Sequence, residues 1–154
     1  ALATTPAATQ PAATELPPPT PTPTAAVPLT EVRGVVSAVL RGATIEAFVN
    51  GQYVTVRYLA IDAPALDERC GPQARDANAA LVLPLEVRLV PDQTDRDAEG
   101  RLLRYVYVGT TLVNAALVAD GWAVADPVPP DTALAAEIAA AGAAAAGRGC
   151  AALP

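Results

Sequence analysis

Residues 32–59 read VRGVVSAVLRGATIEAFVNGQYVTVRYL, and this stretch predicts three consecutive strands. The β-branched run at its start ends at Arg41-Gly42, and a second apolar run, 44–49, ends at Asn50-Gly51. Asn-Gly between runs of this kind is a strong signal for a tight hairpin turn. The return strand, 53–59, alternates so that one face is apolar. The folded part of the chain therefore starts as strands joined by short turns.

After Pro64 the alternation gives way to helices and further strands. The expected elements are a helix over 73–83, strands over 85–90 and 102–108, a helix over 113–119 that Gly121 ends, and a last helix after Asp131, its expected N-cap. A polar, charged loop, 91–101, lies between the two strands. Five strands with interspersed helices fit a small barrel better than a parallel sheet, so the predicted fold is mainly β.

The first thirty residues have a different composition from the rest. Residues 1–30 contain eight Pro, eight Thr and eight Ala, with Glu15 as their one charge. Such a segment has too few large apolar side chains to offset the cost of ordering its backbone. We expect a disordered linker or stalk over 1–30 and one folded domain over 31–154. Pro- and Thr-rich stalks are typical of exported proteins, although base composition alone would also explain this one.

The overall composition excludes several classes of function. The chain has 154 residues, no histidine and no lysine, and only two cysteines. Histidine-based acid–base chemistry and Ser-His-Asp triads are therefore excluded, and two cysteines alone cannot form a four-ligand zinc site. No run approaches the roughly 18 apolar residues of a membrane-spanning helix, so no transmembrane segment is expected.

Four stretches in order resemble the staphylococcal nuclease (thermonuclease) family. They are VVSAVLRGATIEAFVNGQYVTVRYLAIDAP at 35–64, CGPQA at 70–74, DRDAEGRLLRYVYV at 95–108 and LVNAALVADGWA at 112–123. Arg148-Gly149 matches the family's usual ending of its last helix. The resemblance implies an OB-fold, a five-stranded barrel carrying three helices, and the elements predicted from the residues agree with it.

In that family a calcium ion and two arginines hold a phosphodiester while a glutamate assists attack by water. Matched by motif, Arg57 and Arg101 take the places of the two phosphate-binding arginines, and Asp62 takes the place of one calcium-binding aspartate. The other calcium aspartate is replaced by Ala43, and the glutamate is replaced by Ala65. The resemblance therefore implies a degenerate active site.

Losing a metal ligand and a general base removes two separate contributions to the same transition state. Arg41 also brings a positive charge to a position that is acidic in the family. Calcium-dependent nuclease activity is thus expected to be absent or strongly impaired. No cofactor is expected, with Ca²⁺ as the metal if a site survives.

Two alternatives remain open at this site. Neighbouring carboxylates could restore a metal site, the candidates being Asp67, Glu68, Asp95, Asp97 and Glu99. Without a phosphate, Arg57 and Arg101 could instead pair with Asp62 or Glu99 and serve the structure. The residues support a structural role for the two arginines and residual binding of an anion equally well.

The charge of the domain bears on its partners. Outside Glu15, ten arginines stand against fifteen acids, a net charge of -5. Nonspecific binding of nucleic acid relies on a basic surface, and binding of single strands on exposed aromatic residues. The four tyrosines lie on predicted strands, where core packing is the default, and Trp122 is expected to anchor the core or its edge. Nucleic acid is therefore disfavoured, and an unknown protein, an envelope component or a small anion is the expected partner of a monomer.

The two cysteines support export. Secreted members of the family are similar in placing one cysteine before Gly-Pro and another after the last Arg-Gly, as Cys70 and Cys150 stand here. The resemblance thus implies a Cys70–Cys150 disulfide, with two free thiols as the alternative. A disulfide and a stalk both point to an extracellular or envelope location for an exported bacterial protein.

Two hypotheses about function remain. The preferred one is a secreted or envelope-tethered interaction module of nuclease descent that is not an enzyme. The other is an active or weak metal-dependent phosphodiesterase, hydrolysing DNA or RNA, with a rearranged calcium site. Ala43 and Ala65 favour the first, whereas Arg57, Asp62 and Arg101 keep the second open.

Overall fold

The structure, a computed structural model, describes residues 29–154, so almost all of the predicted stalk lies outside the described residues. Its strands are β1 (Val32–Arg41), β2 (Thr44–Val49), β3 (Gln52–Tyr58), β4 (Ile61–Asp62), β5 (Glu86–Val90), β6 (Leu102–Val108), β7 (Thr111–Leu112) and β8 (Val124–Ala125). Its helices are α1 (Gly71–Val82), α2 (Val113–Ala119) and α3 (Ala135–Ala141), followed by the 3₁₀ turns η1 (Gly142–Ala144) and η2 (Gly149–Ala152).

Five of the strands form a closed barrel. They follow one another in the order β3-β2-β1-β5-β6, and β3 pairs with β6 to close the ring. The pairs along this order are antiparallel, whereas the closing pair is parallel, with Val56 opposite Leu102. The prediction of a mainly β, five-stranded barrel with three helices is confirmed. The short strands β4, β7 and β8 carry too few residues for an alternating pattern, so the sequence did not predict them.

The predicted hairpin turn lies between β2 and β3. Asn50 and Gly51 both have positive φ, 49° and 82°, as a two-residue type I′ turn requires. Val49 lies opposite Gln52 across this turn, and the register runs without a shift to Thr44 and Arg57. The turn therefore sets the register that puts the apolar face of β3 inside the barrel.

The barrel interior is filled by alternate residues of the strands. The fully buried side chains include Val36, Ile45, Val49, Val56, Leu89, Leu102 and Val106. Helix α2 adds Leu117 and α3 adds Ile138, both with no exposed surface. Since β-branched and leucine side chains interdigitate here, this cluster supplies the main hydrophobic stabilisation of the domain.

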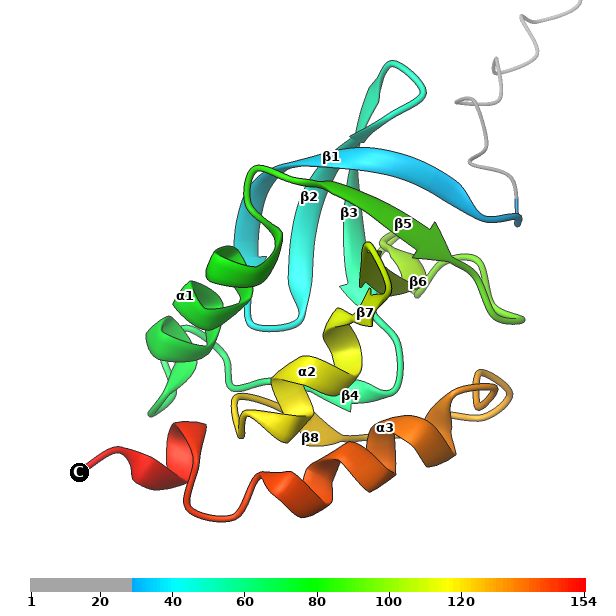
Figure 1. Ribbon diagram of the computed structural model, residues 1–154. Coiled ribbons are helices and arrows are strands. Elements are labelled where there is room, and N and C mark those ends of the chain that lie inside the picture. The colour runs from blue at the N-terminus through cyan, green and yellow to red at the C-terminus, as the bar shows by residue number, and fades with distance from the viewer. Residues whose placement is uncertain (1–28) are drawn as a thin grey trace, which may run out of the picture.

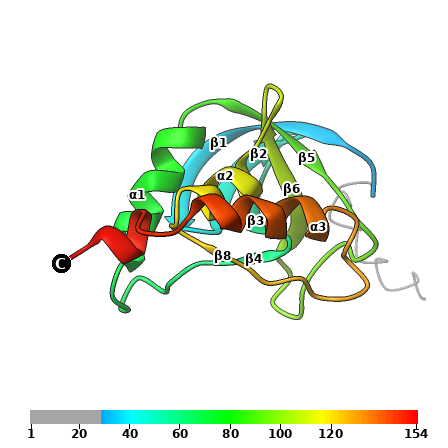
Figure 2. The same ribbon diagram turned by 60° about the horizontal axis from the view of Figure 1, so that its bottom comes forward.

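The helices cover one side and one end of the barrel. Helix α1 lies beside β1, and α2 and α3 lie together at the end of the barrel near β4 and β8 (Figure 1). Figure 2 shows α3 running across this end, with the C-terminal turn η2 beside α1. A disulfide joins Cys70, just before α1, to Cys150 in η2, with their Cα atoms 5.5 Å apart. The disulfide implied by the family resemblance is therefore present. No helix within residues 29–154 is long and apolar enough to cross a bilayer.

The expected role of Asp131 as the N-cap of the last helix is wrong. Helix α3 begins at Ala135, and Leu134 precedes it without a side-chain cap. Asp131 is buried, and its Oδ1 accepts hydrogen bonds from the backbone N–H groups of Gln93 and Thr94 at 2.9 and 2.7 Å. Asp131 therefore caps two backbone N–H groups of the loop after β5 instead of the N-terminus of α3.

The expectation that all four tyrosines pack in the core is wrong for one of them. Tyr58 and Tyr105 are buried, and Tyr107 is half-buried. Tyr53 is 68% exposed, with its ring centroid 5.1 Å from that of Phe48 on the neighbouring strand. It lies on the outer face because it alternates with Val54, which faces inward.

Candidate functional site

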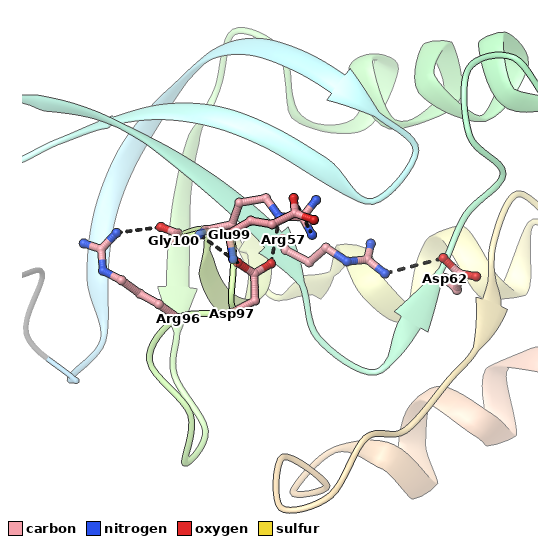
Figure 3. Close-up of polar contacts among 7 residues, drawn as sticks. Arg57, Asp62, Arg96, Asp97, Glu99 and Gly100 are labelled. Atoms are coloured by element: carbon pink, nitrogen blue, oxygen red, sulfur yellow. Dashed lines mark hydrogen bonds and ion pairs between the residues drawn. The ribbon is translucent and has the colours of Figure 1, made fainter.

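The first half of the candidate site is an ion pair between two neighbouring strands. Arg57 lies near the end of β3, and Asp62 ends β4. One Nη atom of Arg57 lies 3.4 Å from Oδ1 of Asp62 (Figure 3). The Arg57 side chain is 25% exposed and that of Asp62 is 57% exposed, so solvent reaches both groups. The pair is therefore accessible to a ligand.

The second half is carried by the loop before β6. The Nε of Arg101 donates to Oδ2 of Asp97 at 2.7 Å, and its Nη2 lies 3.4 Å from a Glu99 carboxylate oxygen. The Oδ1 of Asp97 accepts the backbone N–H groups of Glu99 and Arg101, each at 2.9 Å. Figure 3 shows Asp97 at the centre of this loop. Residues of the loop itself thus hold the Arg101 side chain in place.

These contacts determine the ionisation of Asp97. Burial acts to raise the pKa of the Asp97 carboxyl, but the hydrogen bonds from Arg101 and Glu99 and the charge of Arg101 outweigh it. The net effect lowers the pKa of Asp97 below its ordinary value. Asp97 is consequently a carboxylate at neutral pH and neutralises Arg101.

Arg57 and Arg101 line one pocket. Its volume is about 270 Å³, and its other polar walls include Asp97, Asp126 and Asp131. The backbone of β3 and β6 brings the two arginines together, because Arg57 lies opposite Leu103, two residues after Arg101. Two guanidinium groups at one pocket can bind an oxyanion. Here each of them already has a carboxylate partner.

The two alanine positions have different surroundings. Ala43 is only 1% exposed and belongs to the hydrophobic core, whereas Ala65 is half-buried in the turn after β4. Neither methyl group offers an oxygen ligand. Within residues 29–154, no group of three or more Asp, Glu, Cys or His side chains is placed to hold a metal. Calcium prefers six to eight oxygen ligands, so the residues present do not fit that ion.

The five candidate replacement carboxylates have different surroundings. Asp97 and Glu99 pair with Arg101. Glu68 lines a cavity of about 380 Å³ together with Asp62 and Ala65. Asp67, in the exposed turn after Ala65, lines neither that cavity nor the pocket of Arg57 and Arg101. Of the five, Glu68 is therefore the one that the structure brings to the same cavity as Asp62.

The fifth candidate, Asp95, instead pairs with a buried arginine, Arg104, that was not among the predicted site residues. Arg104 on β6 is 0% exposed, and its Nη2 donates to Oδ1 of Asp95 at 2.6 Å. Its Nη1 also donates to the backbone carbonyl of Asp95 at 2.9 Å. These contacts attach the start of the Arg101 loop to the barrel. The one sequence signal for such a role was a charge at a position of β6 where alternation favours an inward apolar side chain.

A family model and several curated proteins match this sequence. A family model described as staphylococcal nuclease homologue matches residues 55–149. The chain is 38% identical to Protein ParB of Escherichia coli over 102 residues, 36% identical to a micrococcal nuclease of Shigella flexneri over 102 residues, and 39% identical to endonuclease YncB of Bacillus subtilis over 99 residues. These alignments cover 60%, 60% and 59% of this chain, and 56%, 58% and 47% of the three relatives. The chain thus spans about half the length of the curated relatives that it matches.

Proposed function

Since the chain belongs to the staphylococcal nuclease homologue family, we propose that it is a member whose calcium-dependent catalysis is lost or strongly impaired and which acts as a binding module. Its retained arginines are proposed to hold a small anion without a metal. The proposal rests on how the residues around Asp62 are used rather than on the fold, because one fold supports many functions.

One observation carries the proposal. The carboxylate that would bind calcium, Asp62, is paired with the arginine that would bind phosphate, Arg57, at 3.4 Å. The position of the second calcium aspartate is Ala43, whose side chain is buried among apolar residues. Without a cation to share, Asp62 neutralises Arg57, and the site lacks both a metal ligand and the base that Ala65 replaces.

The expected partners follow from charge and location. An acidic domain with a net charge of -5 does not favour nucleic acid, so a small anion, a protein or an envelope component is proposed instead. The Cys70–Cys150 disulfide supports an oxidising compartment, and with the Pro- and Thr-rich first 30 residues it supports the proposal of an exported protein.

A second candidate function is a weak metal-dependent phosphodiesterase. The observation in its favour is that Glu68 and Asp62 line the same cavity. A divalent ion held by these two carboxylates and by water would be a rearranged site. Arg41 lines that cavity too, and its positive charge would oppose the ion.

Calorimetry on the full chain distinguishes the two functions. Calcium and a nucleoside bisphosphate are titrated separately and then together, with hydrolysis of DNA and RNA measured in parallel. The binding module predicts no heat with calcium, nucleotide binding that does not change when calcium is added, and no hydrolysis. Calcium-dependent nucleotide binding with hydrolysis would reject the module and establish the phosphodiesterase. A Glu68→Gln variant identifies the rearranged site, since it should abolish any such activity.

A further inference from the structure

Arg41 differs from the other arginines of the chain. All ten arginines lie within the described residues, and nine of them make an ion pair or a side-chain hydrogen bond there. Within residues 29–154 the Arg41 guanidinium makes neither. Its backbone carbonyl accepts a hydrogen bond from Nδ2 of the buried Asn78 at 3.1 Å. The backbone at the end of β1 is thus held in place, while the guanidinium of Arg41 has no partner in the described residues and can bind a ligand.

Arg41 lines a cavity of about 380 Å³. The cavity lies between the turn after β4 and the end of α2, and Trp122 forms part of its wall. Small apolar residues, among them Pro64, Ala65 and Val124, complete it. A volume of this size suits a small organic molecule, and the wall combines apolar residues with three charged ones, Arg41, Asp62 and Glu68.

The wall that carries Trp122 is held by several contacts. The backbone N–H of Trp122 donates to the carbonyl of Leu117 at 2.9 Å, and that of Cys150 donates to the carbonyl of Gly121 at 3.0 Å. Gly121 has a φ of +81°, and a Cβ there would overlap the carbonyl of Arg148. The turn before Trp122 and the turn that carries the disulfide therefore pack backbone to backbone, so the wall needs little rearrangement to receive a ligand.

Arg41 is the one cationic side chain that lines this cavity in the described part of the chain. Asp62 is neutralised by Arg57, which leaves Arg41 and Glu68 as the lining charges without an ion-pair partner in the described part of the chain. A guanidinium is weakly hydrated and binds carboxylate or phosphate oxygens through two parallel hydrogen bonds. The face of an indole accepts a flat ring.

We propose that this cavity, named here the Arg41 cavity, binds a small organic oxyanion. The carboxylate or phosphate of the ligand lies on Arg41, and its flat ring lies against Trp122. Asp62, which lines this cavity, pairs with Arg57 of the other pocket, but the proposed site does not depend on that pocket binding anything.

Trp122 provides the readout, because it is the single tryptophan of the chain. Its fluorescence is followed while phenyl phosphate, benzoate or inorganic phosphate is added. Saturable changes with phenyl phosphate or benzoate are expected, at affinities roughly tenfold or more above that for inorganic phosphate, which lacks the ring. The stronger of the two aromatic probes identifies phosphate or carboxylate as the preferred group. No saturable change with either aromatic probe would overturn the proposal.

Three variants test the part played by Arg41. Arg41→Gln should lower the affinity for the better probe by roughly tenfold or more, and Arg41→Lys should give an intermediate loss because it keeps the charge without the paired donors. Arg75→Gln is the matched control. It removes the same charge from an exposed pair with Asp76 on α1, and it should leave the affinity unchanged. Circular dichroism establishes that each variant is folded. Equal affinity in the wild type and Arg41→Gln would contradict the proposal.

Two further measurements distinguish an anion site at Arg41 from binding in the other pocket and from a cation site. If the Trp122 response is lost in Arg101→Gln but kept in Arg41→Gln, the ligand binds in the pocket of Arg57 and Arg101. That result would overturn this proposal, whether or not the proposed function is correct. A response to calcium that becomes stronger in Arg41→Gln would show that Asp62 and Glu68 form a cation site instead. We expect neither, because Arg101 does not line the Arg41 cavity and the donors present do not fit calcium.

Discussion

An Nη atom of Arg57 lies 3.4 Å from Oδ1 of Asp62, so the residues that the family assigns to phosphate and to calcium are paired with each other. The side chains are 25% and 57% exposed. An ion pair this accessible contributes between zero and about 1 kcal/mol to stability. A ligand with stronger oxygen acceptors can therefore displace Asp62 at little cost.

Replacing Asp62 with asparagine should release Arg57 for anions. We expect Asp62→Asn to raise the affinity for inorganic phosphate several-fold, because a competing negative charge is removed. The free energy of unfolding should change by less than about 1 kcal/mol. Phosphate titrations by calorimetry and urea unfolding measure the two effects. Weaker phosphate binding in Asp62→Asn would mean that Asp62 positions Arg57 rather than competing for it.

Restoring the two missing carboxylates tests nuclease descent. Ala43→Asp with Ala65→Glu should create calcium binding, and Arg41→Gln added to this pair should strengthen it by removing a nearby positive charge. Because Ala43 is buried, the new aspartate should cost about 2 kcal/mol or more in stability. Gain of calcium-dependent hydrolysis would show that the scaffold still positions phosphate.

The control for this restoration is Ala43→Asn with Ala65→Gln, which adds the same volume without charge and should bind no calcium. If the carboxylate pair binds no calcium either, although it is folded, the site has changed beyond these two positions.

Acid should weaken the Arg101 loop. The pKa of Asp97 in the folded protein lies below its ordinary value, which for the unfolded chain is about 3.9. Its stabilising contribution is thus complete above that pH and is lost as the pH falls through the lower folded pKa. The difference in unfolding free energy between the wild type and Asp97→Asn should be constant near neutral pH and shrink below about pH 4. A difference that persisted unchanged in acid would refute this assignment.

The buried arginine on β6 should depend on its partner. Arg104 has no exposed surface, and its Nε has no hydrogen-bond partner in the described residues. Asp95→Ala would leave a buried cation without a counter-ion and should cost about 3 kcal/mol. Arg104→Met removes the charge as well and should cost less. Urea unfolding of both variants checks the order, and a larger loss in Arg104→Met would contradict it.

Reduction of the disulfide should lower stability. The bridge between Cys70 and Cys150 has a sequence separation of 80 residues, which corresponds to about 4 kcal/mol in the chain-entropy model. Urea unfolding with and without a reductant measures the loss. The double variant Cys70→Ser with Cys150→Ser should be insensitive to reductant. Thiol titration of the unreduced, denatured chain should find no reactive sulfur, and two reactive sulfurs would rule out the bridge.

The barrel strands and the helices could be predicted because their signals are local. Asn50-Gly51 sets a turn through the φ values of two adjacent residues, and alternation places Val54 and Val56 on one face. Asp131 was misassigned for the opposite reason. A capping signal is also local, but Asp131 reaches Gln93 and Thr94, almost forty residues away along the chain.

The candidate site could likewise be predicted from the sequence only in part. The sequence alone shows that Ala43 and Ala65 have no side-chain oxygen to bind a metal or activate water, because folding cannot add an atom that a side chain lacks. Only the tertiary structure decided how the remaining charges are shared. It pairs Arg57 with Asp62 and uses Asp95 to neutralise the buried Arg104. It leaves Arg41 without a side-chain partner in the described residues, in the same cavity as Trp122. The sequence could not show this, because ion pairs depend on distances between segments that lie far apart along the chain.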